Sequence, residues 1–128
     1  MFMNNTAKKY ILIAEDDRFY GNMFETKLQK EGFDVLVCDN GKNLLAAVSS
    51  RKPDLILLDL IMPVMDGFET LKELKANSGS RDIPVVVLSN LGQDEDIERA
   101  KKEGAVDYLV KSNLSIQEMV QKVKDQTE

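Results

Sequence analysis

The feature that most constrains the fold of this chain is a regular alternation of five short apolar runs with five helix-like segments. Apolar runs this short, largely without alternating polar residues, are typical of strands that are covered on both faces of a sheet. An alternating order of strands and helices predicts a parallel sheet with right-handed crossovers and helices on both faces. We expect the five strands at Tyr10–Ala14, Phe33–Cys38, Leu55–Leu58, Val85–Leu88 and Val106–Val110.

Helix signals occupy the segments between these runs. The segment 94–103 is mostly charged, and only Ile97 and Ala100 give it clear apolar anchors. We predict an α/β fold with a five-stranded parallel sheet in the flavodoxin-like order 2-1-3-4-5, although a Rossmann-type order would give the same alternation. The helices are expected from Asp17 or Arg18 to Gly32, at about 41–51, 67–76 and 94–103, and from a capping box at Ser115 and Glu118 onward.

The length of 128 residues suits one domain with one hydrophobic core. No repeat, linker or low-complexity segment interrupts the alternation, so we expect residues 1–128 to form a single domain. We find no DNA-binding motif, and a net charge of −5 leaves no basic excess for nonspecific nucleic-acid binding. Residues 1–7 are short and polar after Met3, which fits neither a signal peptide nor a membrane span.

The counts of histidine and cysteine exclude several kinds of chemistry. The chain has no histidine, which excludes Ser-His-Asp and Cys-His catalysis and zinc sites built from histidine. Its one cysteine, Cys38, cannot form an internal disulfide and is expected to be a small core or edge residue. We therefore expect a cytoplasmic protein without membrane contact.

Acidic side chains follow the first and third apolar runs. Asp16 and Asp17 come after the first run, and Asp59 ends the third. Because the carboxyl ends of parallel strands meet at one edge of a sheet, these residues should lie close together. Three close carboxylates repel one another, and a hard divalent cation such as Mg²⁺ would relieve that repulsion. Considered singly, Asp16 or Asp17 could be a helix cap and Asp59 a strand cap.

The fourth and fifth apolar runs end on Ser89 and Lys111, which we expect at the same edge. A lysine ammonium and a hydroxyl there would stabilise a phosphoryl group, whose charge is spread over its equatorial oxygens. A carboxylate can itself be the nucleophile and form an aspartyl phosphate. Considered singly, Ser89 could be a turn residue and Lys111 a solvated strand end, but the convergence of these residues favours a phosphoryl site.

Several short motifs, taken together, resemble the receiver domain of two-component response regulators. The resemblance covers roughly residues 9–124, and the combination is highly specific although each piece alone is weak. The motifs are Glu15-Asp16-Asp17, Asp59 with Met62-Pro63, Met65-Asp66-Gly67, Leu88-Ser89, Gly104-Ala105 and Tyr108-Leu109-Val110-Lys111.

The resemblance implies a role for each of these residues. Asp59 would accept a phosphoryl group from a phosphohistidine on a sensor histidine kinase or phosphotransfer protein. Ser89 would be the switch hydroxyl, Lys111 the phosphate-binding lysine and Tyr108 the rotating aromatic residue. The phosphorylated chain would dephosphorylate itself and engage a downstream protein through a surface around the fourth helix, fifth strand and fifth helix. Mg²⁺ would be bound by Asp16, Asp17, Asp59 and the backbone carbonyl of Ile61.

Two positions depart from the pattern of this family. The family usually has proline after the lysine, often with a cis bond, whereas Ser112 stands here and a cis bond before it would cost about 2.5–4 kcal/mol. The family also tends to have a small residue after the switch hydroxyl. Asn90 occupies that position, where it would narrow access to Asp59 or bind the phosphoryl group.

Three other functions share parts of the pattern. A flavin binder should have a phosphate loop rich in Ser, Thr or Gly after the first strand, where this chain has three acidic residues. A haloacid-dehalogenase-type phosphatase normally has a second aspartate two residues after the nucleophile, where Ile61 stands here. A receiver-like module that binds partners without phosphorylation is the main alternative, and the complete set of reacting residues favours the phosphorylated switch.

Overall fold

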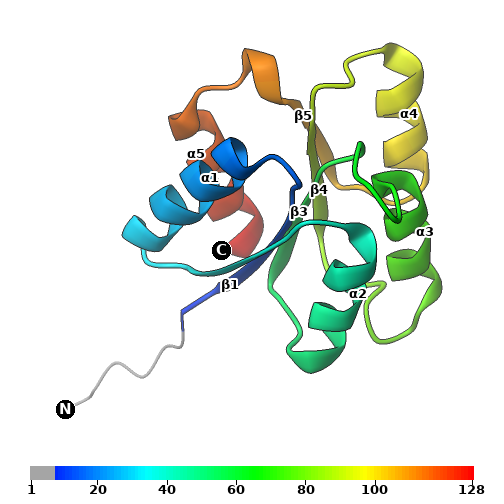
Figure 1. The fold of residues 1–128 in the computed structure, drawn as a ribbon, viewed down its shortest axis with the longest axis horizontal. Coiled ribbons are helices and arrows are strands. Elements are labelled where there is room, and N and C mark those ends of the chain that lie inside the picture. The colour runs from blue at the N-terminus through cyan, green and yellow to red at the C-terminus, as the bar shows by residue number, and fades with distance from the viewer. Residues whose placement is uncertain (1–7) are drawn as a thin grey trace.

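The five apolar runs form one parallel sheet with the strand order β2-β1-β3-β4-β5 in the computed structural model, which describes residues 8–128 (Figure 1). This order confirms the flavodoxin-like prediction and excludes the Rossmann-type alternative. Phe33 and Val106, which we expected to begin strands, each lie one residue before them. The strands are β1 (Tyr10–Ala14), β2 (Asp34–Cys38), β3 (Leu55–Leu58), β4 (Val85–Ser89) and β5 (Asp107–Val110).

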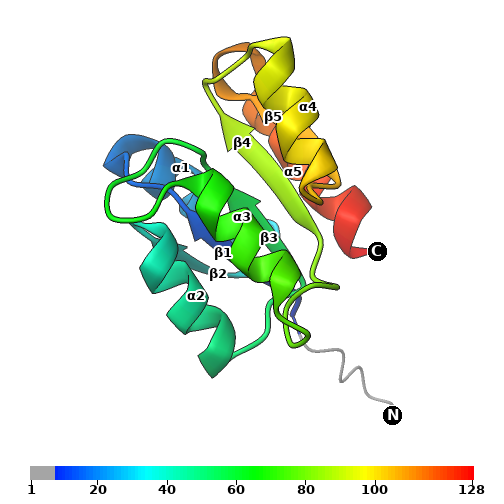
Figure 2. The same cartoon turned by 90° about the vertical axis from the view of Figure 1, so that its right-hand side faces the viewer.

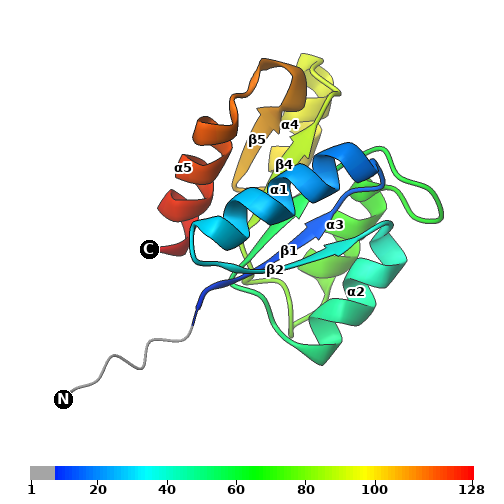
Figure 3. The same cartoon turned by 60° about the vertical axis from the view of Figure 1, so that its left-hand side comes forward.

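Helices cover both faces of the sheet. Helices α2, α3 and α4 lie in front of one face in Figure 2, and α1 and α5 lie over the other face in Figure 3. A short 3₁₀ turn, η1 (Lys111–Asn113), follows β5 and was not expected from the sequence. The helices are α1 (Arg18–Lys30), α2 (Gly41–Ser50), α3 (Gly67–Ala76), α4 (Asp94–Lys102) and α5 (Ile116–Thr127).

The central strands β1, β3 and β4 are apolar at every position except Ser89, the last residue of β4, because both of their faces are buried. In β1, Leu12 and Ala14 pack into the core under α2, α3 and α4, whereas Ile11 and Ile13 pack into the core under α1 and α5. All five residues of this strand are buried. The sheet therefore separates two hydrophobic cores, one under each layer of helices, where the chain length suggested a single core. A half-exposed strand would instead alternate polar and apolar residues.

Helix α4 is held by more than the two apolar anchors that the sequence indicates. Ile97 and Ala100 pack into the core, as expected. The guanidinium of Arg99 also lies 3.9 Å from the ring centroid of Phe68 on α3, a cation–π contact that helical periodicity does not reveal. The helix has no side-chain hydrogen bond at its N-cap, Gln93. In residues 8–128, we find no helix long and apolar enough to span a membrane.

Candidate functional site

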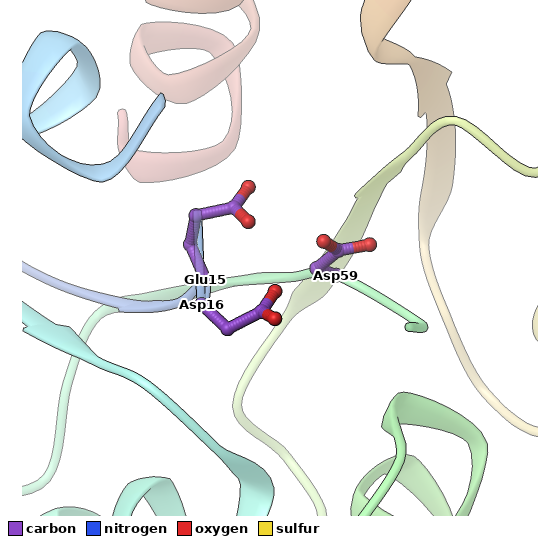
Figure 4. Close-up of side chains that lie close together, drawn as sticks. All are labelled: Glu15, Asp16 and Asp59. Atoms are coloured by element: carbon purple, nitrogen blue, oxygen red, sulfur yellow. The ribbon is translucent and has the colours of Figure 1, made fainter. Parts of the chain in front are cut away.

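Three carboxylates gather at the carboxyl edge of the sheet. Glu15 and Asp16 follow β1 and Asp59 follows β3, and Figure 4 shows their carboxylates directed toward a common space. Each residue offers one oxygen, and these oxygens all lie within 4.8 Å of one another. Glu15 and Asp59 are buried, whereas Asp16 is exposed. The convergence predicted from the parallel strand ends is thus present, although its membership differs from the prediction.

Asp17, which we predicted as a metal ligand, is not one of these three close carboxylates, although it lines the same hollow. Its Oδ1 accepts hydrogen bonds from the backbone N–H groups of Phe19 at 2.8 Å and Tyr20 at 3.3 Å, so it is the N-cap of α1. The first N–H groups of a helix lack intrahelical partners, and an aspartate at the N-cap satisfies them. Glu15, the first residue of the acidic triplet, takes the place in the cluster that we had assigned to Asp17.

Lys111 lies inside the cluster rather than in solvent. Its Nζ is 2.5 Å from Oε1 of Glu15 and 3.0 Å from Oδ2 of Asp59, and its side chain is 4% exposed. The ring centroid of Tyr20 is 4.5 Å from the same nitrogen. Burial alone would lower the pKa of Lys111, but the two carboxylates outweigh burial and raise this pKa. The lysine is therefore a fixed positive charge beside Asp59.

The ionised form of Glu15 is disfavoured at this site. Burial raises the pKa of Glu15 to about 7, and the charge of Asp59 adds to this effect, although hydrogen bonds from Lys111 and Asp17 oppose it. The three oxygens are hard donors of the kind that Mg²⁺ prefers. The donor set thus fits a divalent cation, because such an ion would stabilise ionised carboxylates that the buried site otherwise disfavours.

The residues after β3 shape the hollow around Asp59. The backbone N–H of Ile61 donates to Oδ1 of Asp59 at 3.3 Å. Gly67 begins α3 so close to the strand end that a Cβ there would lie 2.2 Å from the carbonyl oxygen of Asp59. The hollow is lined by Glu15, Asp16, Asp17, Tyr20, Asp59, Ile61, Asn90 and Lys111.

The backbone of Leu91 connects the two residues that we predicted as switch elements. Its N–H donates to Oγ of Ser89 at 3.4 Å, and its carbonyl accepts a hydrogen bond from the hydroxyl of Tyr108. Both Ser89 and Tyr108 are buried. Burial raises the pKa of Tyr108 to about 12, with further contributions from Asp96 and Asp59, so its hydroxyl remains a donor.

The two positions that depart from the family pattern contact each other. Oδ1 of Asn90 accepts a hydrogen bond from the backbone N–H of Ser112 at 3.0 Å. No peptide bond is cis among residues 8–128, so the bond between Lys111 and Ser112 is trans. Sequence reasoning treated these positions separately, because they are far apart in the chain.

Comparison with known proteins places this geometry in a family. The model of the response regulator receiver domain matches residues 11–124. The DNA-binding response regulator MtrA of Mycobacterium tuberculosis is 36% identical over 107 residues, which are 84% of this chain and 46% of MtrA. The chain therefore spans about half the length of such curated relatives.

Two solved structures are similar over nearly the whole chain. The receiver domain of the Francisella response regulator 1452 has a TM-score of 0.86 and 32% identity, over 94% of this chain and 97% of that one. The phosphorylated cyanobacterial phytochrome response regulator RcpA has a TM-score of 0.81 and 30% identity, over 93% of this chain and 91% of that one.

Proposed function

The chain belongs to the response regulator receiver domain family, and from this premise we propose that it is a signalling switch phosphorylated on Asp59. The observation that carries the proposal is the buried Asp59 carboxylate with the Lys111 ammonium 3.0 Å away, at the edge of an acidic hollow. The phosphodonor is a phosphohistidine on a sensor histidine kinase or phosphotransfer protein, and the chain acts in the cytoplasm. Residues 1–128 act as one receiver unit.

The reaction follows from the placement of these groups. One carboxylate oxygen of Asp59 forms the new P–O bond while the P–N bond to the donor imidazole breaks, and that nitrogen leaves with the bonding electron pair and takes a proton. The Lys111 ammonium and the Ser89 hydroxyl stabilise charge on the equatorial oxygens. Mg²⁺, when bound, supplies further positive charge for the same oxygens. The carboxylates of Glu15, Asp16 and Asp59, with the backbone carbonyl of Ile61, would hold this ion.

The direct test is phosphorylation by a small donor. We expect incubation with acetyl phosphate and Mg²⁺ to add the mass of one phosphoryl group, and fragmentation to locate that mass on Asp59. RcpA, which has the same fold and 30% identity, is described as phosphorylated, and this likeness supports the expectation. An unchanged mass would favour the alternative function, a receiver-like module that binds its partner without phosphorylation.

An exposed apolar patch beside the hollow is the proposed docking surface of the phosphodonor protein. Phe19 is 71% exposed, its ring packs edge-on against Tyr20, and Tyr20 lines the hollow. Phe19 and Met23 of α1 also line a groove with Ile116 of α5. A large exposed aromatic side chain next to a reacting group is typical of an interface anchor.

Phe19→Ala is therefore expected to slow phosphoryl transfer from a protein donor at least tenfold, which is roughly the effect of removing one interface anchor. Phosphorylation by acetyl phosphate should be unchanged. The matched control is Leu36→Ala, because Leu36 is also an exposed apolar residue, 44% accessible, but lies on the edge strand β2. Equal transfer rates for the Phe19 variant and the wild type would refute this docking surface.

The output surface includes α4, β5 and α5, because the backbone N–H and carbonyl of Leu91 join Ser89 to Tyr108. A phosphoryl group on Asp59 attracts the Ser89 hydroxyl, and a Ser89 that turns toward it releases the N–H of Leu91. That movement disturbs the carbonyl that holds Tyr108 and the loop that enters α4. The partner is a downstream protein that contacts this surface directly.

Binding of beryllium fluoride with Mg²⁺, a phosphoryl mimic, is expected to change backbone amide shifts more in residues 89–111 than in residues 41–50 of α2. Tyr108→Phe removes the bond to Leu91 and should reduce the shifts in α4 without reducing mimic binding. If the shifts stay confined to the acidic hollow, the proposed output route is wrong.

A further inference from the structure

Asn90 and Ser112 join two loops that each carry one of the reacting groups. The paired part of β4 and β5 ends at Ser89 opposite Val110. Beyond it, the side chain of Asn90 accepts from the backbone N–H of Ser112 at 3.0 Å. In Figures 1 and 2 the loop after β4 and the turn after β5 lie at the same end of the sheet. One hydrogen bond thus continues the connection between these strands after their backbone ladder has ended.

The bond has a clear physical origin. Ser112 lies in the first turn of η1, where a backbone N–H has no partner within the helix. Val110, the N-cap of η1, makes no side-chain capping bond, and Asn90 supplies the missing acceptor from the neighbouring loop. Proline at position 112 would have no N–H to donate. The two departures from the family pattern are therefore parts of one structural feature.

We propose that Asn90 is a positioning residue that, through Ser112, holds the loops that carry Ser89 and Lys111 in fixed relation around Asp59, while the Ser89 hydroxyl remains free to turn. Ser89 directly precedes Asn90 and Lys111 directly precedes Ser112, so the bond spans the residues next to both groups. Asn90 also lines the hollow together with Asp59 and Lys111. Groups held in place before the reaction stabilise its transition state more than groups that must be ordered during it.

The inference rests on the proposed function, because it concerns phosphorylation of Asp59 and hydrolysis of the product. Both reactions use the same hydroxyl and ammonium in an in-line transition state, so loss of the bond should slow both. Asn90→Ala is expected to reduce both rates about three- to tenfold, which corresponds to the loss of one hydrogen bond. Ser112→Ala is the matched control, because it removes a hydroxyl but keeps the backbone N–H.

The experiment measures phosphorylation by acetyl phosphate, hydrolysis of the phosphoprotein, melting temperature and hydrogen exchange of the Ser112 amide for the wild type and both variants. We expect Asn90→Ala to accelerate exchange at Ser112 and to slow both reactions at an unchanged melting temperature, and Ser112→Ala to match the wild type. Faster hydrolysis with unchanged phosphorylation would make Asn90 a steric shield and would overturn the positioning role.

Two further outcomes separate the possible failures. Faster exchange at Ser112 with both rates unchanged would show a bond without a role in the reaction, which also overturns the inference. A wild-type protein that acetyl phosphate does not phosphorylate would overturn the proposed function itself, and the positioning role with it. In the first of these outcomes the wild type is still phosphorylated on Asp59, so the two failures are distinguishable.

Discussion

Asp59→Asn is expected to abolish phosphorylation by both acetyl phosphate and a protein donor, while the protein remains folded. The substitution is nearly isosteric, but a neutral amide lacks the nucleophilic carboxylate oxygen that forms the P–O bond. Its one oxygen can keep the hydrogen bond from the N–H of Ile61 to Oδ1, whereas the amide NH2 that replaces Oδ2 cannot accept from Lys111. The measurement is intact mass after incubation with each donor and Mg²⁺.

Asp54→Asn is the matched control for this loss. Asp54 precedes the same strand, β3, at the opposite edge of the sheet, where its Oδ2 accepts from the N–H of Tyr10 at 2.8 Å. An asparagine keeps that acceptor, so the control removes one negative charge from the chain without touching the hollow. We expect it to be phosphorylated like the wild type. If Asp59→Asn gained the same phosphoryl mass as the wild type, the phosphoacceptor would be another residue and the assignment of Asp59 would be wrong.

The architecture was predictable from the sequence because the physical constraints on this sheet are strong. A strand such as Leu55–Leu58, buried on both faces, cannot carry polar residues, so its boundaries are visible as an uninterrupted apolar run. The positions of Asp59, Ser89 and Lys111 at one edge follow from the parallel direction of their strands. The strand order itself needed the resemblance or the structure, since alternation does not distinguish two doubly wound orders.

Interactions between distant loops were not predictable in the same way. Which residues of the triplet Glu15-Asp16-Asp17 face the hollow depends on where β1 ends and α1 begins, and an error of one residue changes the membership of the cluster. The bond from Asn90 to Ser112 joins positions 22 residues apart through a side chain, and no periodic pattern indicates it. The packing of Arg99 on Phe68 was missed because a charged residue on a helix is normally assigned to solvent.

The membership of the acidic cluster has a measurable consequence for Mg²⁺ binding. A ligand that binds the folded chain alone stabilises it by RT ln(1 + [L]/Kd), or about 2.7 kcal/mol at a concentration one hundred times Kd. Asp16→Asn removes a carboxylate of the cluster and should eliminate most of this stabilisation. Asp17→Asn should retain it, because Asp17 caps α1 and asparagine is an equally good N-cap.

The two substitutions are matched in chemistry and adjacent in sequence, so they distinguish the two possible assignments directly. The measurement is the rise in melting temperature between metal-free buffer and millimolar Mg²⁺ for the wild type and both variants. Asp17→Ala adds a second test, because it should lower stability by about 1 kcal/mol through loss of the cap while leaving the response to Mg²⁺ intact. Asp16 and Asp17 both line the hollow, so the two assignments differ in which of these carboxylates contacts the ion. A response lost in Asp17→Asn and kept in Asp16→Asn would return the metal site to the assignment made from the sequence, with Asp17 turned inward from the helix end.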